Sequence, residues 1–394
     1  MTISQTKPSL DLNRIVSTVK SCLPEGRERY GLHEPSFSGA EWDYVKDCLD
    51  TAWVSTAGAY VGKFESKLSE VTDIPYAAAV VNGTAALHLS LQMLGIEAGD
   101  EVLIPDLTFV ATANAVAYCA ATPHFVDSSP ATLGIDPEKL EKELRKIVTL
   151  KQGEPHNQKT NRRIRALVVM HTFGHPVDLD PILEICNSFH LPLIEDAAEA
   201  LGSFYKNKHV GRWGQISILS FNGNKIVTTG GGGAILTHDK KFAEQAKHLS
   251  TTAKTPHPWK IEHNQVGYNY RMPNLNAALG LAQLEKLPQM LQAKRRLADS
   301  YGRALTGIPG VSFFTEPENS KSNYWLNTIL LAPECRSKRE ELIGLFNENA
   351  VQARPAWELM HRLPMYAACP RMNVETAEDL ESRIINLPSS AFLK

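Results

Sequence analysis

Residues 217–237, SILSFNGNKIVTTGGGGAILT, place one lysine between two apolar runs of the chain. The first run ends at Ser220 and Phe221, a polar turn then carries Lys225, and four glycines precede the second run. Lysine is costly to bring to the end of a buried strand, and a desolvated amine gives up its proton more readily, so that it can attack an aldehyde and form a Schiff base. The ordinary alternative is an exposed lysine on a turn. The neighbouring segments favour the Schiff-base lysine over this alternative.

Short apolar runs alternate with helical stretches on both sides of this lysine. Seven such runs lie at residues 77–81, 101–104, 124–126, 166–170, 191–194, 216–221 and 234–237. The runs are continuously apolar rather than alternating, as in strands that helices cover on both faces. This rhythm predicts an α/β fold whose large domain contains a mainly parallel, seven-stranded mixed sheet. Ligands are expected at the carboxyl ends of its strands.

An acidic cluster, Glu195-Asp196-Ala197-Ala198-Glu199, follows the run 191–194 directly. A carboxylate at the carboxyl end of a strand can pair with a protonated pyridine nitrogen and keep the ring an electron sink, and we predict this role for Asp196. A helix N-cap is an equally good interpretation of Asp196. Glu195 points to the opposite side of a strand. Glu199, one turn further on, is expected either near the phenolic oxygen of such a ring or in solvent.

The turn Asn82-Gly83-Thr84 joins the first apolar run to a helical pattern of leucines. A glycine at a strand-to-helix turn frees backbone N–H groups to meet an anion at the positive end of the helix dipole. Such turns are also common structural joints. The candidate phosphate ligands are Gly83, Thr84 and Ala85 of this turn, together with the hydroxyl of Ser220 at a neighbouring strand end.

Phe109 follows the run 101–104 in the segment DEVLIPDLTFVATANAV. Its ring either stacks on a flat cofactor, which adds about 0.5 to 1.5 kcal/mol beyond burial, or fills the core. The glycines at 230–233 form no G-x-G-x-x-G turn between a strand and a helix, which argues against a nicotinamide-dependent oxidoreductase. They are expected to allow close backbone approach near the lysine loop.

The composition limits the class of protein. A chain of 394 residues with 43% apolar content can build a large and a smaller domain. A formal net charge of -2 lacks the basic excess that binds nucleic acid or anionic membranes, so a small molecule is the expected partner. The six scattered cysteines argue against a metal site or a disulfide framework and fit the cytoplasm. No signal peptide or membrane span is predicted.

The expected organisation has three parts. Residues 1–36 form an N-terminal helix and arm, residues 37–255 the cofactor-binding large domain, and residues 256–394 a smaller C-terminal α/β domain. The polar segment 151–163 is predicted to be a surface loop. A long helical pattern over 274–305 is expected to break at Pro288.

Five segments occur in the order and spacing of the DegT/DnrJ/StrS family of sugar aminotransferases, which the chain resembles over roughly residues 30–390. They are NGTAALHLSL, DEVLIPDLTFVATANAV, LPLIEDAAEALGS, SFNGNKIVTTGGGG and GYNYRMPNLNAALGLAQL. The resemblance implies an aminotransferase of fold type I that depends on pyridoxal 5'-phosphate (PLP) and forms a homodimer with shared active sites. The dehydrating branch of this family carries histidine at the position of Lys225, so the lysine implies transamination.

The resemblance also implies individual roles. Lys225 carries the Schiff base, and Asp196 meets the pyridinium nitrogen. Glu199 departs from the glutamine or histidine that is common at its position, which leaves its contact open. The remaining cofactor contacts implied are Thr84, Ser220, Asn222, Phe109 as the stacking ring, and Asn269, which reaches the phosphate of the other subunit's cofactor.

The implied reaction is ping-pong transfer of the amino group of glutamate, which leaves as 2-oxoglutarate, to a keto sugar. Three further segments resemble the nonulosonic-acid subgroup, of the legionaminic or bacillosamine type, which serves surface polysaccharides such as lipopolysaccharide. The implied acceptor there is C4 of a UDP-linked 2-acetamido-4-keto-6-deoxyhexose. A free keto acid sugar such as an 8-keto octulosonate is an alternative acceptor, and a non-catalytic PLP-binding regulatory protein is an alternative function.

Candidate substrate contacts are polar and aromatic residues outside the cofactor motifs. Arg354 has the clearest physical basis, because a guanidinium can bind a carboxylate or a diphosphate in bidentate fashion. A structural role explains each of them equally well. The set comprises Trp53, Ser55, His171, Arg354 and His361, with His33, Thr56 and Trp357 as further members.

Overall fold

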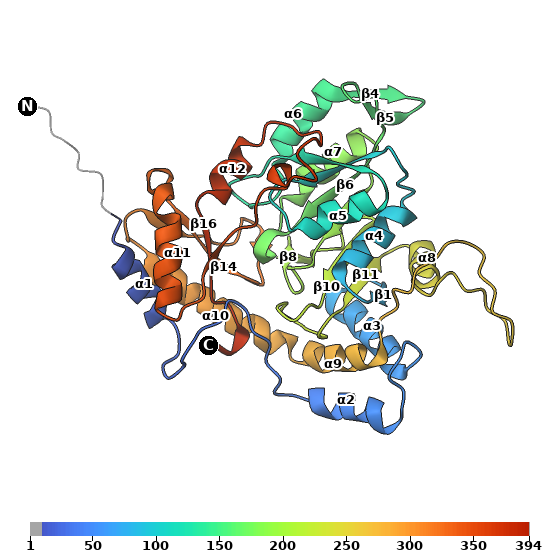
Figure 1. The fold of residues 1–394 in the computed structure, drawn as a ribbon, viewed down its shortest axis with the longest axis horizontal. Coiled ribbons are helices and arrows are strands. Elements are labelled where there is room, and N and C mark those ends of the chain that lie inside the picture. The colour runs from blue at the N-terminus through green and yellow to red at the C-terminus, as the bar shows by residue number, and fades with distance from the viewer. Residues whose placement is uncertain (1–9, 394) are drawn as a thin grey trace, which may run out of the picture.

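The computed structural model describes residues 10–393, and a seven-stranded sheet forms its centre (Figure 1). The strand order is β1-β11-β10-β7-β6-β2-β3. β11 runs antiparallel to both of its neighbours, whereas the pairs from β10 to β3 are parallel. The mainly parallel, mixed seven-stranded sheet of the sequence prediction is therefore confirmed. Its strands are β1 Tyr76–Val80, β2 Glu101–Pro105, β3 Thr122–Val126, β6 Ile164–Met170, β7 Leu193–Asp196, β10 Ile216–Ser220 and β11 Gly233–Thr237.

Successive residues of each strand pack into two separate core clusters on the two faces of the sheet. In β6, for example, Leu167 and Val169 belong to one cluster and Ala166 and Val168 to the other. This two-sided burial explains why the strands are continuously apolar in sequence. One face is covered by α3 Ala59–Thr72, α6 Pro137–Ile147, α7 Leu179–Ser188 and α9 Asn274–Glu285, and the other by α4 Gly83–Met93, α5 Val110–Tyr118 and α8 Lys240–Ser250.

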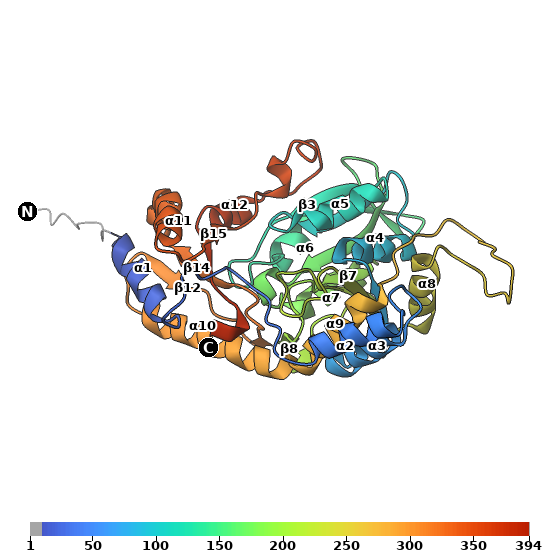
Figure 2. The ribbon, with the colours of Figure 1, turned by 60° about the horizontal axis from the view of Figure 1, so that its bottom comes forward.

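A smaller antiparallel sheet, ordered β12-β14-β16-β15, is built from the C-terminal part of the chain. It confirms the expected smaller α/β unit. Helix α1, Leu12–Ser21, packs beside α10 and α11 in the core of this unit (Figures 1 and 2). The N-terminal helix therefore belongs to the same packed unit as the C-terminal part of the chain. The elements are β12 Val311–Phe313, β14 Asn327–Leu331, β15 Arg354–Pro355, β16 Ile384–Leu387, α10 Leu287–Leu305 and α11 Arg339–Glu348.

The long helical pattern divides at Lys286, two residues before Pro288. Helix α9 ends at Glu285, Lys286 caps it, and Pro288 lies in the first turn of α10. A proline in the first turn costs no hydrogen bond, because the N–H groups there have no intrahelical acceptor. The break therefore precedes the proline, which begins the new helix.

The prediction of a loop over 151–163 is wrong for part of this segment. Residues Val148–Lys151 and Glu154–Asn157 form an antiparallel hairpin, β4 and β5. Its turn residues Gln152 and Gly153 have positive φ of 55° and 83°. The pairing rests on backbone hydrogen bonds. β5 reads Glu-Pro-His-Asn and buries Pro155 and Asn157, so no run of large apolar residues marks this strand.

The remaining elements are short connections and surface helices. Within residues 10–393, no helix has both the length and the apolar character that crossing a membrane requires. The elements are α2 Glu41–Asp50, β8 Phe204–Tyr205, β9 Lys208–His209, β13 Ser320–Lys321, α12 Glu375–Glu381, and short 3-10 turns at Thr172–Gly174, Pro333–Lys338, Met360–Arg362 and Ala391–Leu393.

Candidate active site

A cavity of about 280 Å³ lies at the carboxyl ends of β7 and β10, beside the first turn of α4. This is the edge of the sheet at which ligands of parallel α/β folds bind. The cavity brings together residues that are far apart in sequence. Of the predicted site residues, Gly83, Thr84, Phe109, Asp196, Glu199, Ser220, Asn222, Lys225, Arg354 and Trp357 line it.

Lys225 follows β10 on a turn whose backbone bond runs from the Lys225 N–H to the Asn222 carbonyl, at 3.0 Å. Its side chain is only 13% exposed. The amine nitrogen Nζ lies 3.1 Å from Oε1 of Glu199 and 3.9 Å from the ring centre of Trp325. The amine is thus largely removed from water and has one carboxylate beside it.

Glu199 is buried, and its second oxygen accepts the backbone N–H of Phe173 at 2.9 Å. Burial raises the pKa of Glu199 to about 7, although the neighbouring charge of Lys225 opposes the shift. Residues 197–203 form turns rather than a helix, so Glu199 is not the solvated helix residue that was one of its two interpretations. Its carboxyl can exchange a proton near neutral pH.

We expect Glu199→Gln to remove a pH-dependent loss of stability from the cofactor-free protein. Between about pH 4.5 and about pH 7 the folded carboxyl keeps a proton that the unfolded one has lost, so the free energy of unfolding falls as pH rises through this window and then levels off. Urea unfolding at several pH values gives the free energy of unfolding of wild type and variant. The difference between the two should change by on the order of 3 kcal/mol across this pH window. A difference that is constant with pH would contradict this.

Asp196 ends β7, and its carboxylate faces the cavity from a buried position. Oδ2 accepts the hydroxyl of Thr112 at 3.0 Å, and Oδ1 accepts the N–H of Ala198 at 3.2 Å. Burial raises the pKa of Asp196, and these two donors oppose the shift. Among residues 10–393 no ion pair to Asp196 is present. The N-cap interpretation is wrong, because no helix follows the strand.

The first turn of α4 forms an anion site at the other end of the cavity. The backbone N–H groups of a first helical turn lack intrahelical acceptors, which leaves those of Gly83 and Thr84 for a ligand. Ala85 does not take part as predicted, since its N–H donates to Oδ1 of Asn82, the N-cap, at 2.7 Å. A Cβ on Gly83 would lie 3.0 Å from the Cβ of Ser220, so glycine lets the turn approach the serine.

The glycines at 230–233 serve the close approach that the sequence predicted. A Cβ on Gly233 would lie 2.5 Å from the backbone carbon of Asn82, an impossible contact for any other residue. Gly231 and Gly232 line the cavity. Together these groups form a cradle with an anion site, a buried carboxylate and a lysine amine. This set fits a flat cofactor that carries a phosphate, a ring nitrogen and an aldehyde.

Two of the predicted substrate contacts lie at the cavity. Arg354, at the start of β15, lines it and forms no ion pair within the described part of the chain. Trp357 lines it as well, with its ring centre 6.3 Å from that of Phe109 and 5.0 Å from that of Phe173. Phe109 is 49% exposed, so its ring remains available to a ligand.

Two predicted histidine contacts are corrected by the structure. His171 is fully buried outside the cavity, where Nε2 donates to Glu195 at 3.1 Å and Nδ1 accepts the N–H of Val177 at 3.3 Å. His361 pairs through Nδ1 with the buried Asp106 at 2.5 Å. The ring nitrogens of both residues hold neighbouring segments together, which explains these histidines without a substrate.

Other predicted residues lie outside the cavity of a single chain. Trp53 is 59% exposed, and Thr56 is exposed as well. The backbone carbonyl of Ser55 accepts the N–H of Asn274. Asn269 is exposed and pairs with Thr251 through an isolated bridge. The two ring nitrogens of His33 are buried without a hydrogen-bond partner. Their roles stay predictions.

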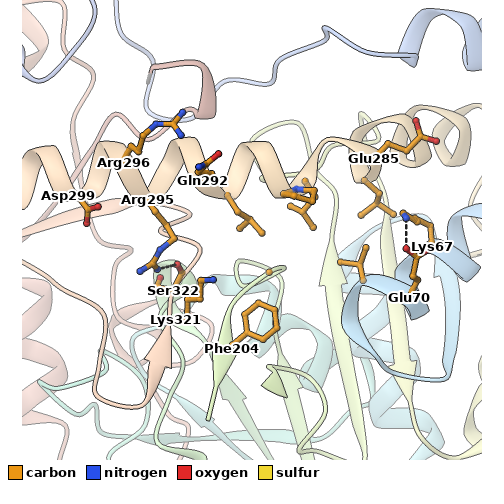
Figure 3. Close-up of a pocket in the computed structure, with 16 residues that line it drawn as sticks. Lys67, Glu70, Phe204, Glu285, Gln292, Arg295, Arg296, Asp299, Lys321 and Ser322 are labelled. Atoms are coloured by element: carbon orange, nitrogen blue, oxygen red, sulfur yellow. Dashed lines mark hydrogen bonds and ion pairs between the residues drawn. The ribbon is translucent and has the colours of Figure 1, made fainter. Parts of the chain in front are cut away.

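A second, larger cavity of about 700 Å³ lies between α3, α10 and β13, away from the strand ends (Figure 3). Two of its basic side chains are held by carboxylates, Lys67 by Glu70 at 2.6 Å and Arg295 by Glu316 at 2.7 Å. It contains no lysine beside a buried carboxylate. The smaller cavity is therefore the candidate active site.

Thr112, Asn82 and Trp325 are site residues that sequence reasoning missed. Asn82 had a signal, because asparagine before Gly-Thr and a helical pattern is a common N-cap. Thr112 lies one turn after Phe109 in α5 and had no distinguishing pattern. Trp325 comes from the C-terminal unit, and no local feature connects it with Lys225.

Comparisons with known proteins agree with this site. The model of the DegT/DnrJ/EryC1/StrS aminotransferase family matches residues 35–394. The GDP-perosamine synthase of Escherichia coli O157:H7 is 40% identical over 91% of this chain and 92% of that protein, and the GDP-perosamine synthase of Caulobacter vibrioides is 36% identical over 93% and 94%. The aminotransferase TlmJ from Streptoalloteichus hindustanus superposes with a TM-score of 0.83 at 26% identity, over 93% and 95%. The nonulosonic-acid subgroup is not confirmed.

Proposed function

Because the chain belongs to the DegT/DnrJ/EryC1/StrS aminotransferase family, we propose that it moves the amino group of glutamate to a GDP-linked keto sugar. The chain is a PLP-dependent sugar aminotransferase. The observation that carries the proposal is the joint placement of the Lys225 amine, the buried Asp196 carboxylate and the Gly83 turn around one cavity.

Each of these groups has a part in holding the cofactor. Gly83, Thr84 and Ser220 would hold the phosphate, and Asp196 would keep the ring nitrogen protonated. Phe109 is placed at the cavity to cover one face of the ring. When bound, PLP supplies an aldehyde for the Schiff base and an electron sink for charge that develops at the amino-bearing carbon.

Lys225 does the proton work in this proposal. Once glutamate has displaced it, the free amine of Lys225 would remove the proton from the α-carbon of glutamate and return it to the former aldehyde carbon of the cofactor. The same amine moves a proton in the reverse sense when the keto sugar is the acceptor. Alternation of the two substrates at one site gives ping-pong kinetics.

Arg354 is the proposed anion clamp for the substrates. It lines the cavity without an ionic partner among the residues described, and a guanidinium there favours a carboxylate or a diphosphate. Glutamate offers a carboxylate and a nucleotide-linked sugar offers a diphosphate, so one positive group can serve both half-reactions.

GDP is proposed as the nucleotide because two relatives that cover over nine-tenths of the chain are GDP-perosamine synthases. An aminotransferase makes an amino sugar from the corresponding ketone, and C4 remains the proposed position. The UDP-linked 2-acetamido sugar implied by the family resemblance is thereby the less favoured acceptor, and the free keto acid sugar has no support from these relatives. Surface polysaccharide synthesis is the proposed setting.

Incubation with glutamate and GDP-, UDP- and dTDP-linked 4-keto-6-deoxy sugars, together with a free keto acid sugar, tests the acceptor. We expect the GDP-linked ketone to be aminated most efficiently, with kcat/KM at least about tenfold above the others, which requires only about 1.4 kcal/mol of preferential binding. Mass spectrometry of the products and assay of 2-oxoglutarate provide the readout. Preference for another nucleotide would refute GDP, and absence of any 2-oxoglutarate would favour the non-catalytic regulatory protein.

The proposal includes a homodimer that shares its active sites. The segment after α8 projects from the body of the molecule (Figures 1 and 2), and large apolar side chains on it are exposed, 81% for Trp259, 73% for Ile261 and 82% for Val266. Exposed apolar groups of this size favour contact with another chain. Asn269 lies at the end of the same segment, from which it would reach the phosphate of the cofactor in the other subunit.

A further inference from the structure

Trp325 reaches the lysine loop from the C-terminal unit of the chain. It lies just before β14, is 2% exposed, and lines the active-site cavity. Its indole Nε1 donates to the backbone carbonyl of Asn224 at 2.8 Å, and its ring centre lies 3.9 Å from Nζ of Lys225. One side chain thus holds both the backbone next to the lysine and the amine at the lysine's end.

The backbone of Trp325 is itself held at both ends of the residue. Its N–H donates to Oδ1 of Asn323 at 2.8 Å, and its carbonyl accepts Nζ of the fully buried Lys294 at 3.1 Å. The amide of Asn323 donates to the carbonyls of Glu199 and Leu201, at 2.9 Å each. The segment therefore ties down the two neighbours of the lysine amine, the tryptophan ring and the Glu199 backbone.

We propose that Trp325 is a positioning residue that receives the free amine of Lys225 on its ring face and fixes the lysine loop through its N–H. A protonated amine is attracted to the face of an aromatic ring, and the Glu199 carboxylate at 3.1 Å defines the second side of the position. The lysine side chain has four rotatable bonds, so without these contacts a released amine would sample many positions. The proposal rests on the proposed function, in which Lys225 is alternately bound and free.

The alternative is that Trp325 only fills the core below the smaller sheet. Two kinds of substitution separate these roles. Trp325→Phe keeps a ring and loses the N–H donor, whereas Trp325→Leu loses both. Fluorinated tryptophans placed at position 325 alone weaken the attraction of the ring face and leave its size nearly unchanged, so they change the amine contact and not the packing.

The first measurement uses the protein without cofactor and follows the rate at which an amine reagent modifies Lys225, by mass spectrometry of its peptide. Because a weaker ring face holds the amine less firmly and leaves it more accessible to the reagent, we expect stepwise faster modification at pH 7 as fluorine is added, reaching about 3- to 10-fold. Trp213 is the matched control, since Lys208 lies 5.1 Å from its ring centre at a distance from the cavity. The same substitutions at Trp213 should leave the Lys225 rate unchanged.

The second measurement uses the loaded enzyme. Trp325→Leu should lower kcat by roughly tenfold, the scale of an amine held less often in place, while the KM for glutamate changes by less than about threefold, and Trp325→Phe should recover part of the loss. Unchanged Lys225 modification across the fluorinated series would overturn the proposal, even where Trp325→Leu fails to fold. A wild type that binds PLP without turnover would instead overturn the proposed function and leave the modification result standing.

Discussion

Replacement of Lys225 by alanine should abolish transamination, with kcat reduced by about 10⁴-fold or more. General acid–base catalysis alone contributes up to about that factor, and the variant also loses covalent attachment of the cofactor. Steady-state formation of 2-oxoglutarate measures the loss. The absorbance of the purified variant should show PLP held without a Schiff base to protein, because Asp196 and the Gly83 turn are unaltered.

Lys208→Ala is the matched control for this prediction, since Lys208 is exposed and lies outside the cavity. Its activity should remain at the wild-type level. Near-normal turnover by Lys225→Ala would remove the lysine from the mechanism and leave the cavity without a group that can move the proton.

The second large effect is expected for Asp196→Asn, with kcat reduced by about 10²- to 10³-fold. An amide cannot ion-pair with a protonated ring nitrogen, so the ring accepts electrons less well when charge develops, and the removal of one such electrostatic contact costs about this much. The amide oxygen can still accept the Ala198 N–H, and the amide NH2 can donate to the hydroxyl oxygen of Thr112, so the fold should persist. Thermal unfolding checks this.

A cofactor analogue with a permanently charged, N-methylated ring nitrogen gives the sharper test. It should restore part of the activity of Asp196→Asn, because the positive charge no longer depends on the carboxylate. Asp180→Asn, which removes the charge of a surface ion pair with Lys206 outside the cavity, is the control and should behave as wild type. Equal rates for wild type and Asp196→Asn would refute the role of Asp196.

The sheet could be predicted strand by strand because each strand is buried on both faces. Such burial requires continuous apolar residues, as in β6 with Ala166, Leu167, Val168 and Val169. The hairpin of β4 and β5 was missed for the complementary reason, since β5 buries Pro155 and Asn157 rather than a run of large apolar residues. The pattern of apolar residues therefore does not reveal this strand pair.

The cofactor site could be predicted as far as it lies at strand ends. Asp196 and Ser220 end β7 and β10, and Gly83 follows β1, so the rule that ligands meet the carboxyl ends of parallel strands places them together. Ala85 was assigned wrongly because the Asn82 side chain, rather than a ligand, takes its N–H. The N-cap side chain and a bound anion both need N–H groups of the first turn of α4, and the N–H of Ala85 is bonded to the cap.

The sequence by itself determined the α/β class, the seven strands and the lysine between the sixth and seventh of them, since local apolar pattern and turn chemistry depend on neighbouring residues. Only the tertiary structure decided which distant side chains share the cavity. It placed the Trp325 ring against Lys225, although the indole and its carbonyl acceptor at Asn224 are separated by 101 positions in sequence. It also placed His171 and His361 in pairs with buried carboxylates, away from the cavity. Contacts of this kind arise when separate units pack, and their free energy depends on geometry that no short segment of sequence contains.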